Sequence, residues 1–295
     1  MTRNGETGTR VLVTGAASGL GRAIAAHYAA AGCRVLVTDL AEPAALPAGQ
    51  TAWHRLDVRS DAEWAAVRQW CETHWGGLDV LVNNAGVAAA GRVERIEDAD
   101  WDWILDINLR GTVRGCRAFV PVLKRQGGGH IVNIASLAGL MNLPGMSSYN
   151  VSKAAVISLS ETLRHELAPW GVHTTVVCPG FVPTGLDSGL RSPDPVLADQ
   201  AARLIRKGSF TPEQVAAQVA DAVARRRFLV LTHPEGRRAL RVRRLWPALV
   251  DRQIAAVWRR TRTKLDEQDA QDARGARDGA PDGAPDTEGT GERSA

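Results

Sequence analysis

Tyr149 and Lys153 are the residues whose types and spacing most directly suggest chemistry. They lie four positions apart in a predicted helix, so their side chains project from the same face, one turn apart. A phenol with a pKa near ~10 is a poor base at neutral pH, and an adjacent ammonium group stabilises the phenolate and lowers that pKa. The pair is therefore predicted to act as a general acid/base, with the lysine also placed to hold a ribose hydroxyl.

Ser136 is a second candidate for the same chemistry. It follows a β-branched run, His130 to Ala135, which is typical of a strand. Open α/β sheets bind their ligands at the carboxyl ends of parallel strands. The Ser136 hydroxyl is therefore a candidate to orient a substrate oxygen.

A glycine-rich turn, TGAASGLG, occupies residues 14–21 directly after the first predicted strand. Gly15, Gly19 and Gly21 permit a tight turn and let backbone amides approach a pyrophosphate at the positive end of the next helix. Eighteen residues after Gly21 the second predicted strand ends at Asp39, whose carboxylate can bind both hydroxyls of an adenosine ribose and would repel a 2′-phosphate. NAD is therefore predicted in preference to NADP, with Arg22 as the only basic residue placed to weaken that preference.

The elements that must position these residues alternate along the chain. Short β-branched runs and longer helical patterns follow one another from Arg10 onward, as in βαβ units. The predicted strands span 10–14, 34–39, 51–57, 78–83, 130–135, 172–178 and 228–232, and the predicted helices span 19–31, 60–75, 99–125, 147–168 and 211–226. The pattern predicts an α/β fold, a doubly wound parallel sheet of about seven strands with helices on both faces.

Five segments are expected along the chain. Residues 1–9 are predicted to be a flexible N-terminus and residues 10–236 the catalytic domain, within which the proline-containing stretch 180–210 is predicted to be a substrate lid. Residues 237–265 predict a basic amphipathic helical extension, because an apolar stripe runs through Leu249, Val250, Ile254, Val257 and Trp258. Residues 266–295 form an acidic tail rich in Gly, Ala, Asp and Pro and are expected to be disordered.

Charge and composition limit the functions to consider. Residues 237–265 carry a net +9 and residues 266–295 a net −6, so subtracting both from the total of +4 leaves about +1 on residues 1–236. This nearly neutral body does not indicate a nucleic-acid partner. The cysteines and histidines show no metal-ligand spacing, so no metal is expected. The absence of a long apolar run and of an N-terminal hydrophobic segment predicts a cytoplasmic protein.

Taken together, the motifs resemble those of the short-chain dehydrogenase/reductase family, from about Arg10 to Leu231. The matching pieces are TGAASGLG at 14–21, Asp57-Val58, NNAG at 83–86, Asn108, Ser136, the YNVSK run at 149–153 and Pro179-Gly180, in the order and at the spacing of the family. The resemblance implies a Rossmann-type sheet and a catalytic tetrad of Asn108, Ser136, Tyr149 and Lys153. It also implies that Asn108 binds a water linking Lys153 to solvent, and that a homodimer or homotetramer packs through the helices containing Asn108 and Tyr149.

The same resemblance implies a set of cofactor contacts. Asp57 and Val58 are placed against the adenine, Asn83 and Gly86 beside the cofactor, and Thr184 on the nicotinamide carboxamide. The full predicted cofactor set comprises Gly15, Ser18, Gly19, Leu20, Gly21, Asp39, Asp57, Val58, Asn84, Ala85, Gly86, Tyr149, Lys153, Pro179, Gly180, Val182 and Thr184. Position 18, where NADP-preferring members often carry a basic residue, is Ser, and Leu40 is also uncharged, which again favours NAD.

The expected function is that of an NAD-dependent oxidoreductase that interconverts a secondary alcohol and a ketone. The predicted walls of its substrate site are 137–146, 181–190 and the segment after Gly86. Residues 137–146 and 181–190 contain no arginine, the next being Arg191, and the apolar residues that dominate the walls are Leu140, Met141, Leu143, Met146, Phe181, Val182 and Leu186. An apolar or cyclic alcohol, terpenoid- or steroid-like, is therefore expected.

Two alternatives remain open. One is an NADP-dependent carbonyl reductase of the same family. The other is a protein that acts mainly by binding an anionic membrane or a partner through residues 237–265. For that segment the preferred interpretation is a helix whose apolar stripe packs on the domain or on a dimer mate while its arginines face water.

Overall fold

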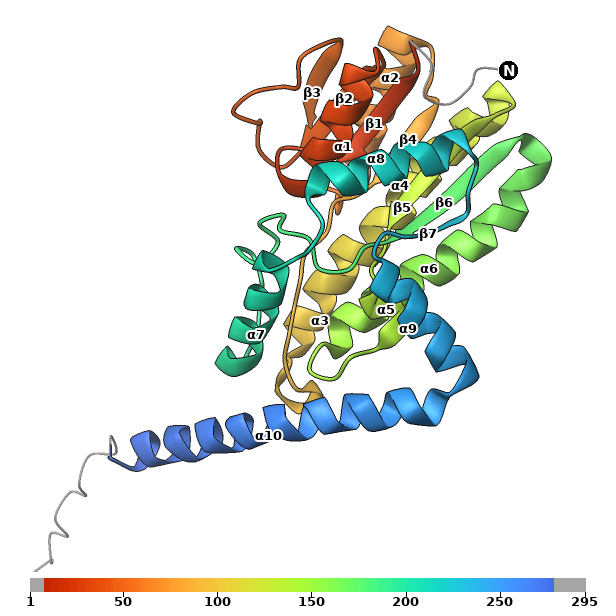
Figure 1. Cartoon of the computed structure of the whole chain (residues 1–295). Coiled ribbons are helices and arrows are strands. Elements are labelled where there is room, and N and C mark those ends of the chain that lie inside the picture. Colours follow the sequence, from red (N-terminus) through yellow and green to blue (C-terminus); the bar gives the residue numbers. More distant parts are fainter. Residues whose placement is uncertain (1–7, 279–295) are drawn as a thin grey trace, which may run out of the picture.

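A parallel sheet of seven strands organises the molecule, in a computed structural model that describes residues 8–278 (Figure 1). The strands are β1 (Arg10–Thr14), β2 (Arg34–Asp39), β3 (Thr51–Arg55), β4 (Val80–Asn83), β5 (Gly129–Ile134), β6 (Val172–Cys178) and β7 (Leu229–Leu231). Their order is β3-β2-β1-β4-β5-β6-β7, and every neighbouring pair is parallel. The chain winds outward in opposite directions from β1 and β4, which makes the carboxyl ends of these two strands the expected ligand crevice. The predicted fold class is confirmed.

Helices connect the strands and cover the sheet. They are α1 (Gly19–Ala30), α2 (Asp61–Trp75), α3 (Asp98–Leu105), α4 (Gly111–Gln126), α5 (Ala138–Met141), α6 (Ser147–Leu167), α7 (Pro195–Arg206), α8 (Pro212–Ala224), α9 (Pro234–Leu245) and α10 (Pro247–Asp278). Polar residues just before two of these helices determine where they begin. The Ser60 hydroxyl caps α2 by accepting from the Glu63 amide, and Thr211 and Gln214 form a reciprocal capping box at α8.

The strands are apolar on both faces because both faces are covered. In β1, Val11 and Val13 point toward the core that includes α1 and α8, while Leu12 between them points to the opposite core. That second core contains Trp64 of α2 and Phe119 of α4, both fully buried. The alternation of a strand thus supplies two cores at once, which holds the carboxyl edge of the sheet rigid for a site.

The predicted helix 99–125 is interrupted in the structure. Helix α3 ends at Leu105, a π-helical turn spans Asp106–Arg110, and α4 begins at Gly111. Asn108 lies within the widened turn, and its amide group binds Val87 twice, accepting from the Val87 amide (2.8 Å) and donating to the Val87 carbonyl (3.0 Å). Such single-turn bulges gather at functional sites, and hydrophobic periodicity does not reveal them.

Part of each terminal segment predicted to be flexible or disordered is ordered in the structure. Helix α10 continues through residues 266–278, which were predicted to be disordered, because Leu265 is buried and Asp269 pairs with Arg92 and Arg95. At the N-terminus Thr9 is buried and its carbonyl accepts from the Arg34 amide at 2.9 Å, so it is not flexible. The rest of both predicted flexible segments, residues 1–7 and 279–295, lies outside the described residues.

The predicted basic helix 237–265 is two helices that meet at a corner. Pro247 begins α10 and cannot continue α9, since it has no amide hydrogen for the helical ladder. Within residues 8–278, no helix combines the length and the apolar character needed to cross a bilayer.

Candidate active site at the carboxyl edge of the sheet

Four polar side chains from three elements meet beyond β5. Tyr149 and Lys153 lie on α6 and are 8% and 5% exposed, and Lys153 Nζ lies 5.9 Å from the centre of the Tyr149 ring. Lys153 Nζ donates to the Ile134 carbonyl at 3.1 Å, at the end of β5, and Ser136 follows two residues later. A Cβ atom on Gly86 would lie 3.0 Å from Asn108 Oδ1 and 3.3 Å from Lys153 Nζ. Asn108 and Lys153 thus meet at Gly86, Lys153 lies beside Tyr149, and Tyr149 is hydrogen-bonded to Ser136, so the structure brings the four predicted residues together.

The loop that carries Ser136 is held from both sides. The Ser136 hydroxyl accepts from the Ala138 amide at 3.1 Å, and the Leu137 amide donates to the Pro179 carbonyl at 2.8 Å. Helix α5 packs directly on the backbone of α6, because a Cβ on Gly139 would lie 2.6 Å from the carbonyl carbon of Lys153. Only glycine permits this approach, so Gly139 fixes the distance between the serine loop and the helix that carries Tyr149.

Burial controls the titration of the two reacting groups. Desolvation raises the pKa of Tyr149, and a hydrogen bond with Ser136 opposes that rise only in part. Desolvation also lowers the pKa of Lys153 to about 8. The pKa of Tyr149 is therefore shifted upward here rather than downward as expected beside an ammonium, because desolvation is the largest effect. A cationic group brought close to Tyr149 would restore the predicted direction.

The glycine-rich turn forms a narrow cradle at the start of α1. Gly15 and Gly19 have φ of 63° and 54°, in the left-handed region that favours glycine. A Cβ on Gly19 would lie 2.5 Å from the Thr184 carbonyl oxygen, and one on Gly21 would lie 2.2 Å from the Gly15 carbonyl oxygen. Any side chain at these positions would fill the cradle, so the backbone here fits a dinucleotide pyrophosphate.

The NNAG segment is tied to this cradle. Asn84 donates from Nδ2 to the carbonyls of Thr14 (2.8 Å) and Gly15 (3.1 Å). The Thr14 hydroxyl accepts from the amides of Asn84 and Ala85, each at 3.0 Å. The loop after β4 is thereby fixed against the loop after β1, on the two strands that flank the ligand crevice. These bonds give Asn84 a structural role that holds Gly86 in place.

Asp39 lies at the same edge, at the end of β2. Its two carboxylate oxygens accept from the amides of Ala17 (2.9 Å) and Leu40 (2.7 Å), so the group is oriented beside the glycine-rich turn. Arg22 is exposed, and within residues 8–278 it forms neither a hydrogen bond nor an ion pair with this carboxylate. The carboxylate retains lone pairs for the two hydroxyls of a ribose.

Several residues of the predicted cofactor set have other partners. Asp57 forms an ion pair with Arg59 (Nη2 to Oδ2 2.7 Å), and the hydrogen bond from Arg59 lowers the pKa of this carboxyl. An adenine contact would share the carboxylate with Arg59. Val182 and Leu20 are buried in the core on the α1 side, so their side chains face the core. The Ser18 side chain makes no cap bond at the start of α1.

The sequence reasoning missed His233, which holds the Pro179-Gly180 turn. His233 Nδ1 accepts from the Gly180 amide at 3.0 Å, and Nε2 lies 3.2 Å from the Phe181 carbonyl. The ring is buried directly under Gly180, where a Cβ would lie 3.0 Å from its Cγ. The available signal was position: His233 comes just after the last predicted strand, at the same edge as the other site residues.

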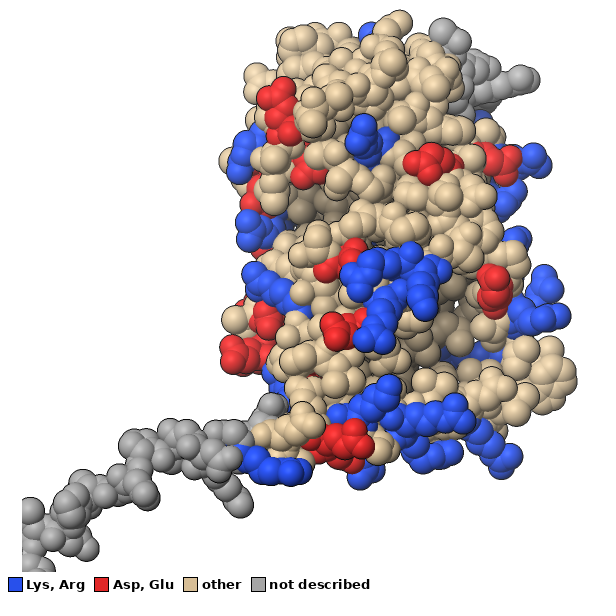
Figure 2. All heavy atoms as spheres, turned by 60° about the vertical axis from the view of Figure 1, so that its left-hand side comes forward, with Lys and Arg blue, Asp and Glu red and all other residues tan. Residues whose placement is uncertain are grey.

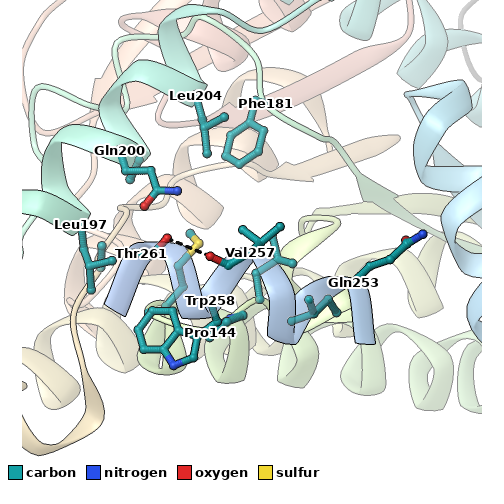
Figure 3. Close-up of a pocket in the computed structure, with 15 residues that line it drawn as sticks. Pro144, Phe181, Leu197, Gln200, Leu204, Gln253, Val257, Trp258 and Thr261 are labelled. Carbon is teal, nitrogen blue, oxygen red and sulfur yellow. Dashed lines mark hydrogen bonds between the residues drawn. The ribbon is translucent and has the colours of Figure 1, made fainter. Parts of the chain in front are cut away.

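An apolar cavity of about 250 Å³ lies between α7, α10 and the segment that precedes α6 (Figure 3). Phe181 and Leu204 stand on one side of it, and Val257 and Trp258 of α10 on the other. None of its lining residues is charged: Ala90, Leu143, Pro144, Gly145, Met146, Phe181, Leu197, Gln200, Ala201, Leu204, Gln253, Ile254, Val257, Trp258 and Thr261. Met146 links the cavity to the tetrad, because it also packs in the cluster that contains Tyr149.

The cavity walls agree only in part with the prediction. Leu143, Met146 and Phe181 line it, whereas Val182 faces the core and Leu186 packs near Tyr149. The sequence did not predict that α10 forms one wall of the cavity. Amphipathic periodicity predicts a buried apolar stripe on this helix, but it does not show which surface the stripe covers. Arg191 forms no clamp, because its guanidinium lies 4.1 Å from the centre of the Trp103 ring.

A cluster of four charges fixes α10 over this cavity. Asp194 precedes α7 at its N-cap position, and its fully buried side chain makes no cap bond but accepts from Arg92 Nη2 at 2.7 Å. Asp269 of α10 binds Arg92 Nη1 at 2.8 Å and Arg95 Nη2 at 2.7 Å. Desolvation alone would raise the pKa of Asp194, but the hydrogen bonds from Arg92 lower it overall. The cluster joins the start of α7, the segment after NNAG and α10.

The chain is similar in sequence and structure to known dehydrogenases. Residues 9–194 match the family model described as short chain dehydrogenase. The chain is 39% identical over 225 residues to 2-(R)-hydroxypropyl-CoM dehydrogenase of Xanthobacter autotrophicus, covering 72% of this chain and 88% of that protein. It is 32% identical to D-beta-hydroxybutyrate dehydrogenase of Rhizobium meliloti, covering 70% and 81%. A short-chain dehydrogenase/reductase from Burkholderia phymatum, solved in complex with NAD, matches with a TM-score of 0.78 and 34% identity, covering 84% and 96%.

Proposed function

The chain belongs to the short-chain dehydrogenase family, and from this premise we propose that it is an NAD-dependent oxidoreductase that interconverts a secondary alcohol and a ketone. The observation that carries the proposal is that Asn108 and Lys153 meet at Gly86 while Lys153 also lies beside Tyr149, which is hydrogen-bonded to Ser136. The test is formation of NADH, followed by absorbance, when the protein meets NAD and a panel of secondary alcohols. Absence of turnover with both NAD and NADP across the panel would overturn the proposal.

The proposed chemistry assigns one task to each side chain. NAD, when bound, supplies the hydride acceptor and a positive charge that favours the Tyr149 phenolate. In the oxidative direction the Tyr149 oxygen takes the hydroxyl proton of the alcohol, and Ser136 donates to the developing carbonyl oxygen. Lys153 binds the ribose and stabilises the Tyr149 oxygen. Asn108 holds the water that the family resemblance implies, and this water links Lys153 to solvent in a proton relay.

The cofactor preference rests on Asp39. Replacing Asp39 with alanine removes a charged acceptor for two ribose hydroxyls and removes its repulsion of a 2′-phosphate. Each lost charge-assisted bond is worth roughly 1.5–3 kcal/mol, so we expect the ratio of NAD to NADP affinity to fall by about a hundredfold. Calorimetric titration of both coenzymes measures that ratio.

The matched control is Glu42→Ala, an exposed acidic residue three positions along the chain. It changes the net charge equally and is expected to leave both affinities unchanged. An unaltered ratio in the Asp39 variant, or equal shifts in the two variants, would remove Asp39 from this role, and tighter binding of NADP than NAD by the parent chain would favour the NADP-dependent carbonyl reductase.

The substrate is proposed to be an apolar, cyclic secondary alcohol. The cavity beside Met146 offers no charged side chain to bind a carboxylate or sulfonate. Its volume of about 250 Å³ lies just below the usual range for small-molecule sites, which favours a terpenoid-sized ring over a larger steroid. A homodimer or homotetramer, implied by the family resemblance, also stays a prediction.

Trp258 is expected to set the size limit of that substrate. Truncation to alanine opens the α10 side of the cavity, so kcat/KM for a bulky cyclic alcohol should rise relative to cyclohexanol by about tenfold, equivalent to ~1.4 kcal/mol. The matched control is Leu249→Ala on the same helix, because Leu249 is exposed and outside the cavity. An unchanged ranking of alcohols in the Trp258 variant would show that substrate binds elsewhere.

A further inference from the structure

The corner between α9 and α10 presents apolar side chains to solvent. Residues 245–249, with the sequence LWPAL, are all exposed. Leu245, Trp246 and Leu249 are 65%, 60% and 49% exposed. In Figure 1 this corner lies at the lower right, away from the sheet. A contiguous apolar patch bordered by polar residues marks contact with another surface.

Basic side chains surround this corner. Figure 2 shows Lys and Arg gathered along the lower part of the molecule, over the region of α10. Between residues 234 and 252 there are six arginines against Glu235 and Asp251, a net charge of +4: Arg237, Arg238, Arg241, Arg243, Arg244 and Arg252. Within residues 8–278, only the Arg243 side chain among these has a hydrogen-bond partner, the Leu140 carbonyl. The other five are available to bind anions.

The charge around the corner argues against a second copy of this chain as its occupant. In a two-fold symmetric contact each corner would meet the same corner of the partner. Arginines would then face arginines, with only Glu235 and Asp251 to balance them. An anionic bilayer complements both features, because lipid phosphates bind arginine and the interface accepts tryptophan and leucine.

We propose that the corner formed by α9 and α10 docks the enzyme on an anionic membrane surface. Trp246 and its apolar neighbours enter the lipid interface, and Arg241 and Arg244 bind headgroup phosphates. The remaining apolar residues of α10 stay packed on the domain, since Val250 and Leu265 are buried. Docking therefore needs no refolding, and the packed and the membrane-bound interpretations apply to different residues of this segment.

The test is co-sedimentation of the full chain with two kinds of vesicle, phosphatidylcholine alone and phosphatidylcholine with about a third phosphatidylglycerol. The protein is expected to bind the anionic vesicles and to be released by added salt. Trp246→Ser combined with Leu249→Ser, and separately Arg241→Glu combined with Arg244→Glu, should each lower the partition coefficient by at least about tenfold. NAD titration and circular dichroism of each variant confirm that the fold is intact.

Two matched variants serve as controls. Trp170→Ser removes a half-exposed tryptophan outside α9 and α10, and Arg203→Glu with Arg225→Glu makes the same change in net charge. Both should bind anionic vesicles like the parent chain. Equal loss in control and corner variants, or no loss in the corner variants, would overturn the proposal. Self-association without lipid that the corner variants abolish would also overturn it, in favour of a second copy.

Discussion

Tyr149→Phe is expected to lower kcat/KM for secondary alcohols by about a thousandfold or more, while NAD affinity changes by less than about threefold. The phenolic oxygen is the only part removed, and it is the proposed acceptor of the substrate proton. The ring stays in the buried cluster with Ile104 and Ala88, so packing should be preserved. Steady-state kinetics and calorimetric titration of NAD measure the two effects separately.

The chain provides its own control for this variant, because it contains only two tyrosines. Tyr28 is as buried as Tyr149, and its hydroxyl has no hydrogen-bond partner among the described residues. Tyr28→Phe should therefore leave activity unchanged. Near-parental turnover in the Tyr149 variant, or an equal loss in both, would remove Tyr149 from the proposed role.

Lys153→Met is the second large effect, and it should damage both rate and binding. Methionine keeps the length of the side chain but loses the ammonium that binds the ribose and supports the Tyr149 oxygen. We expect kcat/KM to fall by about two to three orders of magnitude and the Kd for NAD to rise by about tenfold. Because burial lowers the pKa of Lys153 to about 8, the parent chain should lose NAD affinity as pH rises through that value.

The pH dependence distinguishes this role from a structural one. In the Lys153 variant the loss of NAD affinity near pH 8 should disappear, since no ammonium remains to titrate. Lys264→Met, an exposed lysine on α10, is the control and should keep the parental pH profile. A Lys153 variant with parental NAD affinity and an unaltered profile would contradict the assignment.

Sequence patterns predicted the alternating strands and helices of the parallel sheet. Three strands, β1, β2 and β6, begin and end where the β-branched runs predict, because both of their faces are buried and the runs are continuous. The glycine turn follows β1 and Ser136 follows β5, as the sequence predicts, because the loops after parallel strands all lie at the carboxyl edge of the sheet. Local signals are strong at these positions and tertiary contacts agree with them.

Features that depend on distant partners were not predictable. The helix at 266–278 is stabilised by the ion pairs of Asp269 with Arg92 and Arg95. The composition of this segment does not reveal these distant partners. The pKa of Tyr149 depends on how completely the surrounding chain removes water, which spacing to Lys153 does not reveal. His233 acts on Gly180 across fifty-three positions, and no local motif marks it.

The central claim is that one site holds both NAD and the tyrosyl oxygen that moves the proton. A crystal structure of the chain grown with NAD tests it most directly. We expect the pyrophosphate on the cradle of Gly15, Gly19 and Gly21, the ribose hydroxyls on Asp39 and Lys153, and the nicotinamide beside Tyr149. Coenzyme bound with its nicotinamide directed away from Tyr149, or density for NAD outside this cradle, would contradict it.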